Sequence, residues 1–143
     1  MADDGGAWRN PYTAGCDEME CTFGGSYGHQ INNGGWNPND IKRTQIWQES
    51  YMGIRKTNMM IERVDECDAV EEEKRRWKGE AYFLRAYFHF ELLKRYGNIV
   101  KVDHSIGMDE VNTLGQTPYD DVVAWIVSEC DEAASKLPVT HAN

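Results

Sequence analysis

Apolar residues recur at spacings of three and four along three long segments, which is the pattern of amphipathic helices. The pattern predicts helices over 38–64, 69–96 and 118–137. The second helix carries two apolar stripes, so we expect neighbours on two of its sides. Its stripes are Trp77, Ala81, Leu84, Phe88 and Phe83, Ala86, Phe90, Leu93; those of the other helices are Trp47, Tyr51, Ile54, Asn58, Ile61 and Tyr119, Val122, Ile126, Cys130, Ala133, Leu137. The body of the chain is therefore predicted to be all-α.

One position of the first stripe, Asn58, is polar. A buried amide needs hydrogen-bond partners, so we interpret Asn58 as a structural residue that fixes packing, with ligand contact as the alternative.

Capping signals accompany the expected helix ends. Asn37, Asp68 and Thr117 each stand three residues before an acid, as N-terminal caps do. Gly97 and Pro138 supply the stops. The connection 97–116 contains a short β-like run at 99–102, and because it is unusually long we expect it to pack on another element or to bind a partner.

The first 36 residues have a different composition. They hold eight of the 13 glycines and five aromatic residues, without helical periodicity. We therefore divide the chain into a loop-rich segment, 1–37, and a helical segment, 38–143.

Composition and charge exclude some functions. The chain has 143 residues and a net charge of −9, without a basic block, which argues against nucleic-acid binding because phosphates are neutralised by Lys and Arg. No apolar run approaches the roughly 18 residues of a membrane span. Residues 1–6 show neither the basic nor the apolar region of a secretory signal.

Candidate chemistry is sparse. No motif for a metal, a cofactor or a nucleophile is present, and we expect none; His89, among aromatic residues, is interpreted as a packed or solvent-facing helix residue. Glu80 and Glu91 could serve as paired carboxylates, but an ion pair with Arg85 is the better explanation for at least one of them. Cys16 and Cys21 could form a disulfide, whereas Cys130 fits a small core residue. No catalytic residue is predicted.

The aromatic residues of the loop-rich segment allow two interpretations. They pack against the helices, or they stack on sugar rings while nearby Asn and Arg side chains bind hydroxyls. The candidate ligand contacts are Trp8, Arg9, Tyr12, Tyr27, Trp36 and Asn37.

Residues 77–97, WKGEAYFLRAYFHFELLKRYG, closely resemble the G-E-A-x-F-L-R-A-x-x-x-F-x-L-x-x-x-Y-G motif of SusD/RagB-type proteins. Residues 51–58 are similar to the Y-x-x-I-R-x-x-N helix of that family, and 117–138 to its closing helix. The resemblance covers about 38–138. Within it we assign Glu80, Arg85 and Tyr96 to the scaffold, and expect Gly79 with Ala81 or Ala86 to permit close helix approach.

The resemblance implies tetratricopeptide-like helix pairs and the N-terminal portion of a Bacteroidetes outer-membrane lipoprotein. Such a protein would be exposed at the cell surface, attached only through a lipid anchor that is absent from this chain. It would bind polysaccharides, oligosaccharides or other nutrients without catalysis and deliver them to a SusC-like TonB-dependent transporter. The residues alone also allow a general protein–protein interaction module built from helix pairs. Because the second helix is apolar on two sides, we further expect self-association or marginal stability of this chain.

Overall fold

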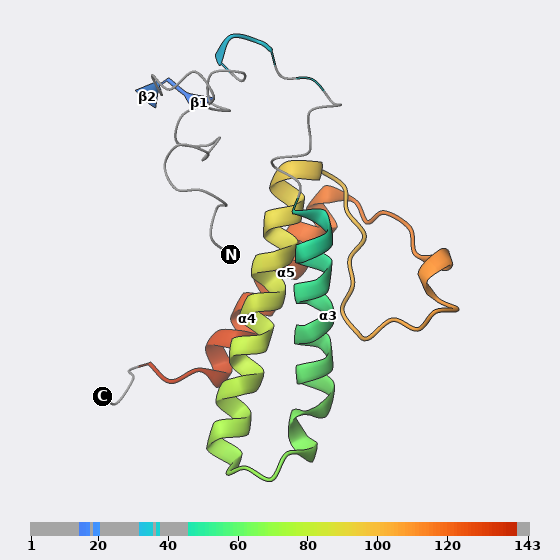
Figure 1. The fold of residues 1–143 in the computed structure, drawn as a ribbon. Coiled ribbons are helices and arrows are strands. Elements are labelled where there is room, and N and C mark those ends of the chain that lie inside the picture. The colour runs from blue at the N-terminus through green and yellow to red at the C-terminus, as the bar shows by residue number, and fades with distance from the viewer. Residues whose placement is uncertain (1–14, 18, 21–31, 36, 38–45, 140–143) are drawn as a thin grey trace. The chain divides into compact units, whose positions relative to one another are not determined.

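The structure, a computed structural model, describes residues 15–17, 19–20, 32–35, 37 and 46–139. The chain divides into two compact units, Met1–Gln45 and Ile46–Asn143. The described elements, in order, are β1 (Gly15–Cys16), β2 (Met19–Glu20), α3 (Trp47–Arg63), η3 (Val64–Glu66), α4 (Glu71–Tyr96), η4 (Val111–Thr113) and α5 (Tyr119–Lys136) (Figure 1).

In the first unit, β1 and β2 form an antiparallel pair with Gly15 opposite Glu20 and Cys16 opposite Met19. Strands this short show no alternation of polar and apolar residues, so the pattern analysis does not predict them. Further along, the Gly35 N–H donates to Asn33 Oδ1 at 2.9 Å across Gly34, whose φ of 72° suits glycine. The possible Cys16–Cys21 disulfide lies outside the described residues.

The second unit is helical, as predicted, although its helices begin later than expected. Ile46 has φ −116° and ψ 7°, so a continuous helix from Pro38 is wrong; α3 begins at Trp47. Asp68 does not cap α4 either, because Val70 is its N-cap and residues 67–70 form the turn from η3. Residues 38–45, which carry the other expected start, lie outside the described part.

The ends of α4 and α5 follow local rules. Gly97 ends α4 with φ 70° and donates its N–H to Leu93 O. Three glutamates open α4 and Lys94 and Arg95 close it, which suits the helix dipole. At α5 the predicted Thr117 cap is wrong: Pro118 is the N-cap, and Asn98 Oδ1, from across the connection, accepts the Tyr119 N–H at 3.0 Å.

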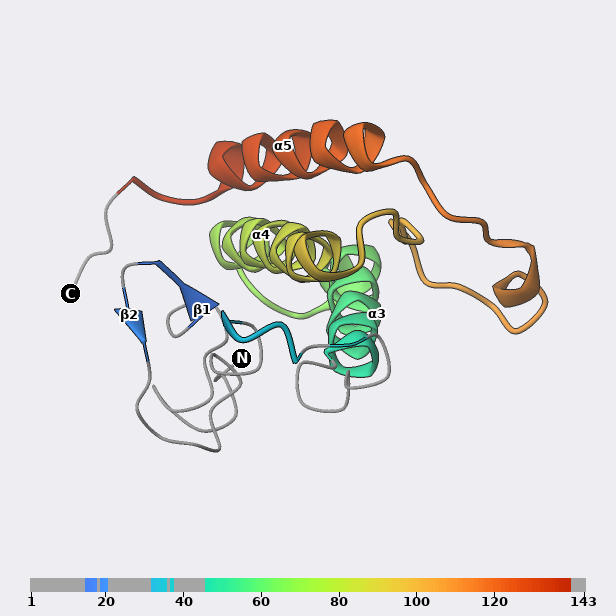
Figure 2. The same cartoon turned by 90° about the horizontal axis from the view of Figure 1, so that it is seen from above.

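Helices α3 and α4 form an antiparallel hairpin, and α5 runs antiparallel to α4 (Figure 1). Helix α4 lies between α3 and α5 and packs on both (Figure 2). The expectation of neighbours on two sides of the second helix is therefore confirmed.

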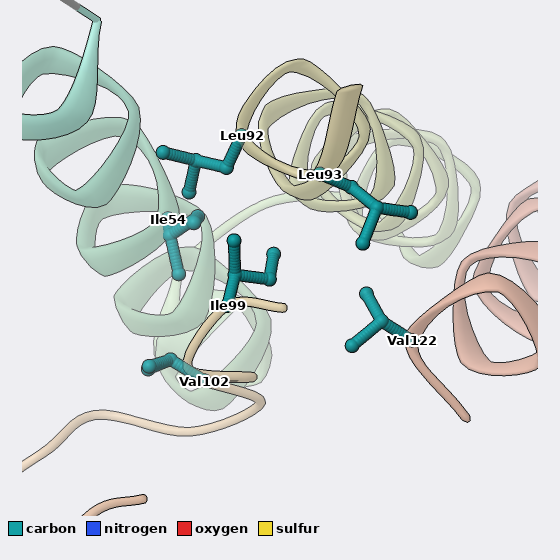
Figure 3. Close-up of a cluster of buried hydrophobic side chains, with 6 residues drawn as sticks. All are labelled: Ile54, Leu92, Leu93, Ile99, Val102 and Val122. Atoms are coloured by element: carbon teal, nitrogen blue, oxygen red, sulfur yellow. The ribbon is translucent and has the colours of Figure 1, made fainter. Parts of the chain in front are cut away.

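The apolar core joins all three helices and the connection between α4 and α5 (Figure 3). Its buried members are Ile54, Leu92, Leu93, Ile99, Val102 and Val122. The β-like run thus packs on the helices, and Thr117 N donates to Ile99 O at 2.7 Å in an isolated antiparallel bridge. Of the two expectations for the connection, packing on another element is therefore confirmed for residues 99–102.

The predicted stripes of α4 are partly wrong. Phe83, Leu84 and Phe90 are exposed by 51%, 44% and 48%, whereas Arg85 and His89 are buried. The reason is that Arg85 and His89 have hydrogen-bond partners between the helices, so at these positions burial does not follow hydrophobicity. The other stripes are closer to expectation, although Trp47 and Tyr119 are exposed and Cys130 is half-buried.

Two glycines allow close contact between helices. A Cβ at Gly79 would lie 3.0 Å from side-chain atoms of Lys136 and Leu137, as the expected close approach requires. A Cβ at Gly53 would lie 2.5 Å from the Phe88 ring, a contact that the sequence analysis does not anticipate.

Candidate functional site

The most organised polar cluster surrounds Arg85 in the middle of α4. Its guanidinium forms a bidentate ion pair with Glu129 of α5, with Nε–Oε2 at 2.6 Å and Nη2–Oε1 at 2.9 Å. Nη1 donates to Asn58 Oδ1 of α3 at 2.8 Å and to the Asp103 carbonyl at 2.6 Å. One arginine thereby connects all three helices and the connection.

Asn58 completes this cluster from the side of α3. It is fully buried, and its amide donates to the carbonyls of Val102 and His104 at 3.4 and 2.7 Å. The amide therefore uses its oxygen and its nitrogen on protein groups. This confirms the structural interpretation of Asn58.

His89 lies one turn after Arg85 and is fully buried. The Val102 N–H donates to Nε2 at 3.1 Å, so the proton of the neutral ring is on Nδ1, which donates to Arg85 O at 2.8 Å. Burial lowers the pKa of His89 to about 4, mainly by desolvating the charged form. His89 is therefore a packed residue that holds the backbone of the connection.

Two further side chains hold the same part of the connection. The Tyr51 hydroxyl donates to Val100 O at 2.9 Å, and burial raises the pKa of Tyr51 to about 12. Glu62 Oε1 accepts the Ser105 N–H at 2.7 Å, and hydrogen bonding to Ser105 lowers the pKa of Glu62. Residues 99–105 form no β-strand beyond the Ile99 bridge, but we call them the inner strand for short; they are thus fixed to α3 and α4 along their length.

Aromatic rings enclose the ion pair. The Arg85 guanidinium lies 5.1 Å from the Tyr82 ring centre and 5.6 Å from that of Trp125. The Trp125 ring meets His89 edge-on at 4.6 Å, and Lys101 lies 5.6 Å from the Trp125 ring. These contacts leave the cluster a packed interior rather than an open site.

The expected pairing of Arg85 with Glu80 or Glu91 is wrong, because Arg85 binds Glu129. Glu80 is exposed beside Arg76, with the Arg76 Nε and a carboxylate oxygen 3.5 Å apart. Glu91 binds Lys94 and Arg95 on its own helix. Burial raises the pKa of Glu91, but those two hydrogen bonds outweigh it, and the pKa is lowered overall. Glu91 therefore lacks the raised pKa of a general acid.

The predicted ligand contacts fall mostly on another part of the chain. Trp8, Arg9, Tyr12, Tyr27 and Trp36 lie outside the described residues, and Asn37 is exposed. The assignment of these residues to a ligand site stays a prediction.

Within the described ranges, no three His, Cys, Asp or Glu side chains come together in a way that could hold a metal ion. No helix there is long and apolar enough to cross a membrane.

Sequence reasoning missed Glu129 and the Asp103 carbonyl as partners of Arg85. Glu129 is one of several acids on α5, and only its position one turn before the buried Ala133 and two after Val122 distinguishes it. That signal, an acid on the apolar face of a helix, was available. A backbone carbonyl carries no residue-specific signal at all.

Comparison with known proteins identifies the fold. A family model described as starch-binding and associating with the outer membrane, SusD-like, matches residues 8–142. The chain belongs to the SusD-like family. Its expected all-α, tetratricopeptide-like fold class is confirmed by solved members of that family.

Individual relatives are distant in sequence and much longer. SusD-like protein P2 of Formosa agariphila is 23% identical over 78% of this chain and 22% of its own length. A solved SusD-like protein of Bacteroides fragilis is 31% identical, with a TM-score of 0.64 over 68% of this chain and 19% of its own. A laminarin-binding SusD-like protein superposes with a TM-score of 0.72 at 24% identity over 80% of this chain and 24% of its own. The chain therefore spans about a fifth of the relatives it matches.

Proposed function

We propose that this chain is the scaffold portion of a non-catalytic protein that binds glycans at the bacterial surface. Membership of a family described as starch-binding and outer-membrane-associated carries the proposal. A similar solved structure that binds laminarin supports a glycan as the ligand. Delivery of the glycan to a SusC-like TonB-dependent transporter, and attachment through a lipid anchor, complete the proposal and follow from the family resemblance.

The roles within the chain divide between its two units. In the helical unit the guanidinium of the motif residue Arg85 donates its hydrogen bonds to Glu129, Asn58 and the Asp103 carbonyl, so Arg85 has a scaffold role. We assign glycan contact to the aromatic residues before position 37, above all Trp8 and Trp36. Aromatic rings stack on the C–H faces of sugars, which gives affinity without any catalytic group.

The test is calorimetric titration of the chain with laminarin and with soluble starch. We expect saturable binding that falls at least tenfold in Trp8→Ala and in Trp36→Ala. Tyr119→Ala, which removes an exposed aromatic residue from α5, is the matched control and should bind as the original chain does. Unchanged affinity in both tryptophan variants would place the site elsewhere, and reducing ends released during a day-long incubation would indicate an enzyme.

A second candidate function is a protein–protein interaction module. It is favoured by the exposed apolar residues Phe83, Leu84 and Phe90 on α4. This candidate predicts no response to either glycan and binding to a protein partner that weakens when Phe83 and Phe90 are replaced by Ser.

A further inference from the structure

The connection between α4 and α5 has a second part beyond the inner strand. Residues 107–113, which we call the outer segment, leave the helices and contain the 3₁₀ helix η4. Figure 1 shows the connection extending away from the helix bundle. Within the described residues, the outer segment's backbone hydrogen bonds stay inside it, between Glu110 or Val111 and Gly107 and between Thr113 and Glu110.

One side chain of the inner strand reaches the outer segment. His104 Nε2 lies 2.8 Å from Glu110 Oε1, while its Nδ1 lies 2.9 Å from Asp103 Oδ1. A carboxylate oxygen can only accept, so both ring nitrogens must donate to make both contacts. A neutral imidazole carries a single N–H and satisfies one of the two carboxylates. The geometry therefore requires the doubly protonated, cationic ring.

We propose that His104 is a proton-operated clamp, which holds the outer segment against the inner strand when the ring is cationic and releases it when the ring loses a proton. The carboxylate contact that breaks is the one to Glu110. Asp103 is the neighbouring residue, and its carbonyl is fixed by Arg85, so it remains beside the ring.

The surrounding charges favour this behaviour. Around His104, Asp103 and Glu110 come from the connection and Glu62 from α3, and the cations nearby are Lys101, bound to Asp103, and Arg85, bound to Glu129 of α5. Hydrogen bonds from His104 to Asp103 and to Glu110 raise the pKa of His104. Once the ring is neutral, Glu110 and Asp103 repel each other without a cation between them.

The sign follows from linkage. Because the folded pKa of His104 is above the unfolded value near 6.5, the clamp is complete below that pH and is lost as pH rises through the folded pKa. Each unit by which the clamp raises that pKa corresponds to a tenfold fall in the closing constant between the two limits of pH.

The test is an NMR titration of the histidine rings and of the amides of the outer segment. We expect His104 to titrate above 6.5 with protons on both nitrogens in the low-pH form, and the amides of 107–113 to shift with the same midpoint. Glu110→Gln should lower the His104 pKa and remove the pH response of those amides. Asp109→Asn, which removes the same charge one residue earlier, should leave both unchanged.

Hydrogen exchange gives an independent reading. After correction for base catalysis, the protection of the outer segment should fall as the pH rises above the His104 pKa. The expected factor is tenfold for each unit by which the His104 pKa of the original chain exceeds that of Glu110→Gln. His104→Gln should abolish the pH dependence. An unchanged His104 pKa in Glu110→Gln, or outer-segment amides that ignore the His104 titration, would overturn the proposal.

Discussion

Around its middle, α4 departs from the usual order of an amphipathic helix. The face between α3 and α5 buries Arg85 and His89, whereas the opposite face exposes Phe83 and Phe90 by about half. The buried polar groups are tolerated because each has partners with good geometry, and an unpaired one would be costly. The comparison teaches that hydrogen-bond partners keep Arg85 and His89 buried, whereas apolar packing buries Leu92 and Leu93 farther along the same helix.

The largest expected effect comes from breaking the buried ion pair. Glu129→Ala leaves the Arg85 cation without its partner and should lower the free energy of unfolding by about 3–5 kcal/mol in urea titrations. Glu132→Ala removes an exposed carboxylate from the same helix, bound to Lys136, and should cost less than about 1 kcal/mol.

The double replacement Arg85→Met with Glu129→Met removes both charges of the pair, whereas Glu129→Ala removes one and leaves the other buried. We expect it to be more stable than Glu129→Ala, because no charge stays buried. If Glu129→Ala and Glu132→Ala lower the free energy of unfolding equally, the buried ion pair contributes little to the stability of the fold.

Acid should weaken the same face through His89. Its folded pKa of about 4 lies below the unfolded value near 6.5, so its neutral form stabilises the fold above pH 6.5. This contribution, roughly 3 kcal/mol, should be lost as pH falls from 6.5 to 4. The measurement is urea unfolding at several pH values in the original chain and in His89→Gln, whose stability should change much less over that range. Parallel pH profiles would contradict the assignment.

A smaller effect is expected where α4 meets α3. Gly53→Ala would place a Cβ 2.5 Å from Phe88 and should destabilise the chain by about 2 kcal/mol through overpacking. Gly107→Ala, with no atom within 4 Å of the new Cβ, is the control. Thermal melting of both variants measures the difference, and equal melting temperatures would mean that Phe88 moves aside without cost.

The exposed face should give the smallest change. If Phe83 and Phe90 cause the expected self-association, replacing both by Ser should weaken it roughly tenfold, or about 1.4 kcal/mol, in sedimentation equilibrium. Met108→Ser removes an apolar side chain that is 89% exposed on the connection, and should leave association unchanged. A monomeric original chain at high concentration would remove the basis of this prediction.

The sequence predicts the three helices and their all-α class because periodicity and stop signals are local. It fails at the helix starts, where the turn 67–70 and the Asn98 contact to Tyr119 depend on tertiary structure. The structural role of Asn58 was predictable from one polar residue in an apolar stripe. Glu129 was recognisable as an acid on the apolar face of α5, but its pairing with Arg85, 44 residues away, does not follow from local patterns.

The candidate ligand site divides in the same way. Composition alone points to Trp8, Trp36 and their neighbours, and nothing in the described residues tests that choice. The motif around Arg85, by contrast, has a physical explanation within the fold: it holds three helices and the inner strand together.

The two ends of the connection between α4 and α5 are held together, so the position of α5 does not depend on how long the connection is. The Ile99–Thr117 bridge and the Asn98 contact to Tyr119 fix both ends of the connection at one point. Residues inserted between 107 and 113 would enlarge a loop whose ends already meet, and doubling a loop costs only about 0.6 kcal/mol in closure entropy. A longer segment can therefore stand in this place while α5 keeps its position.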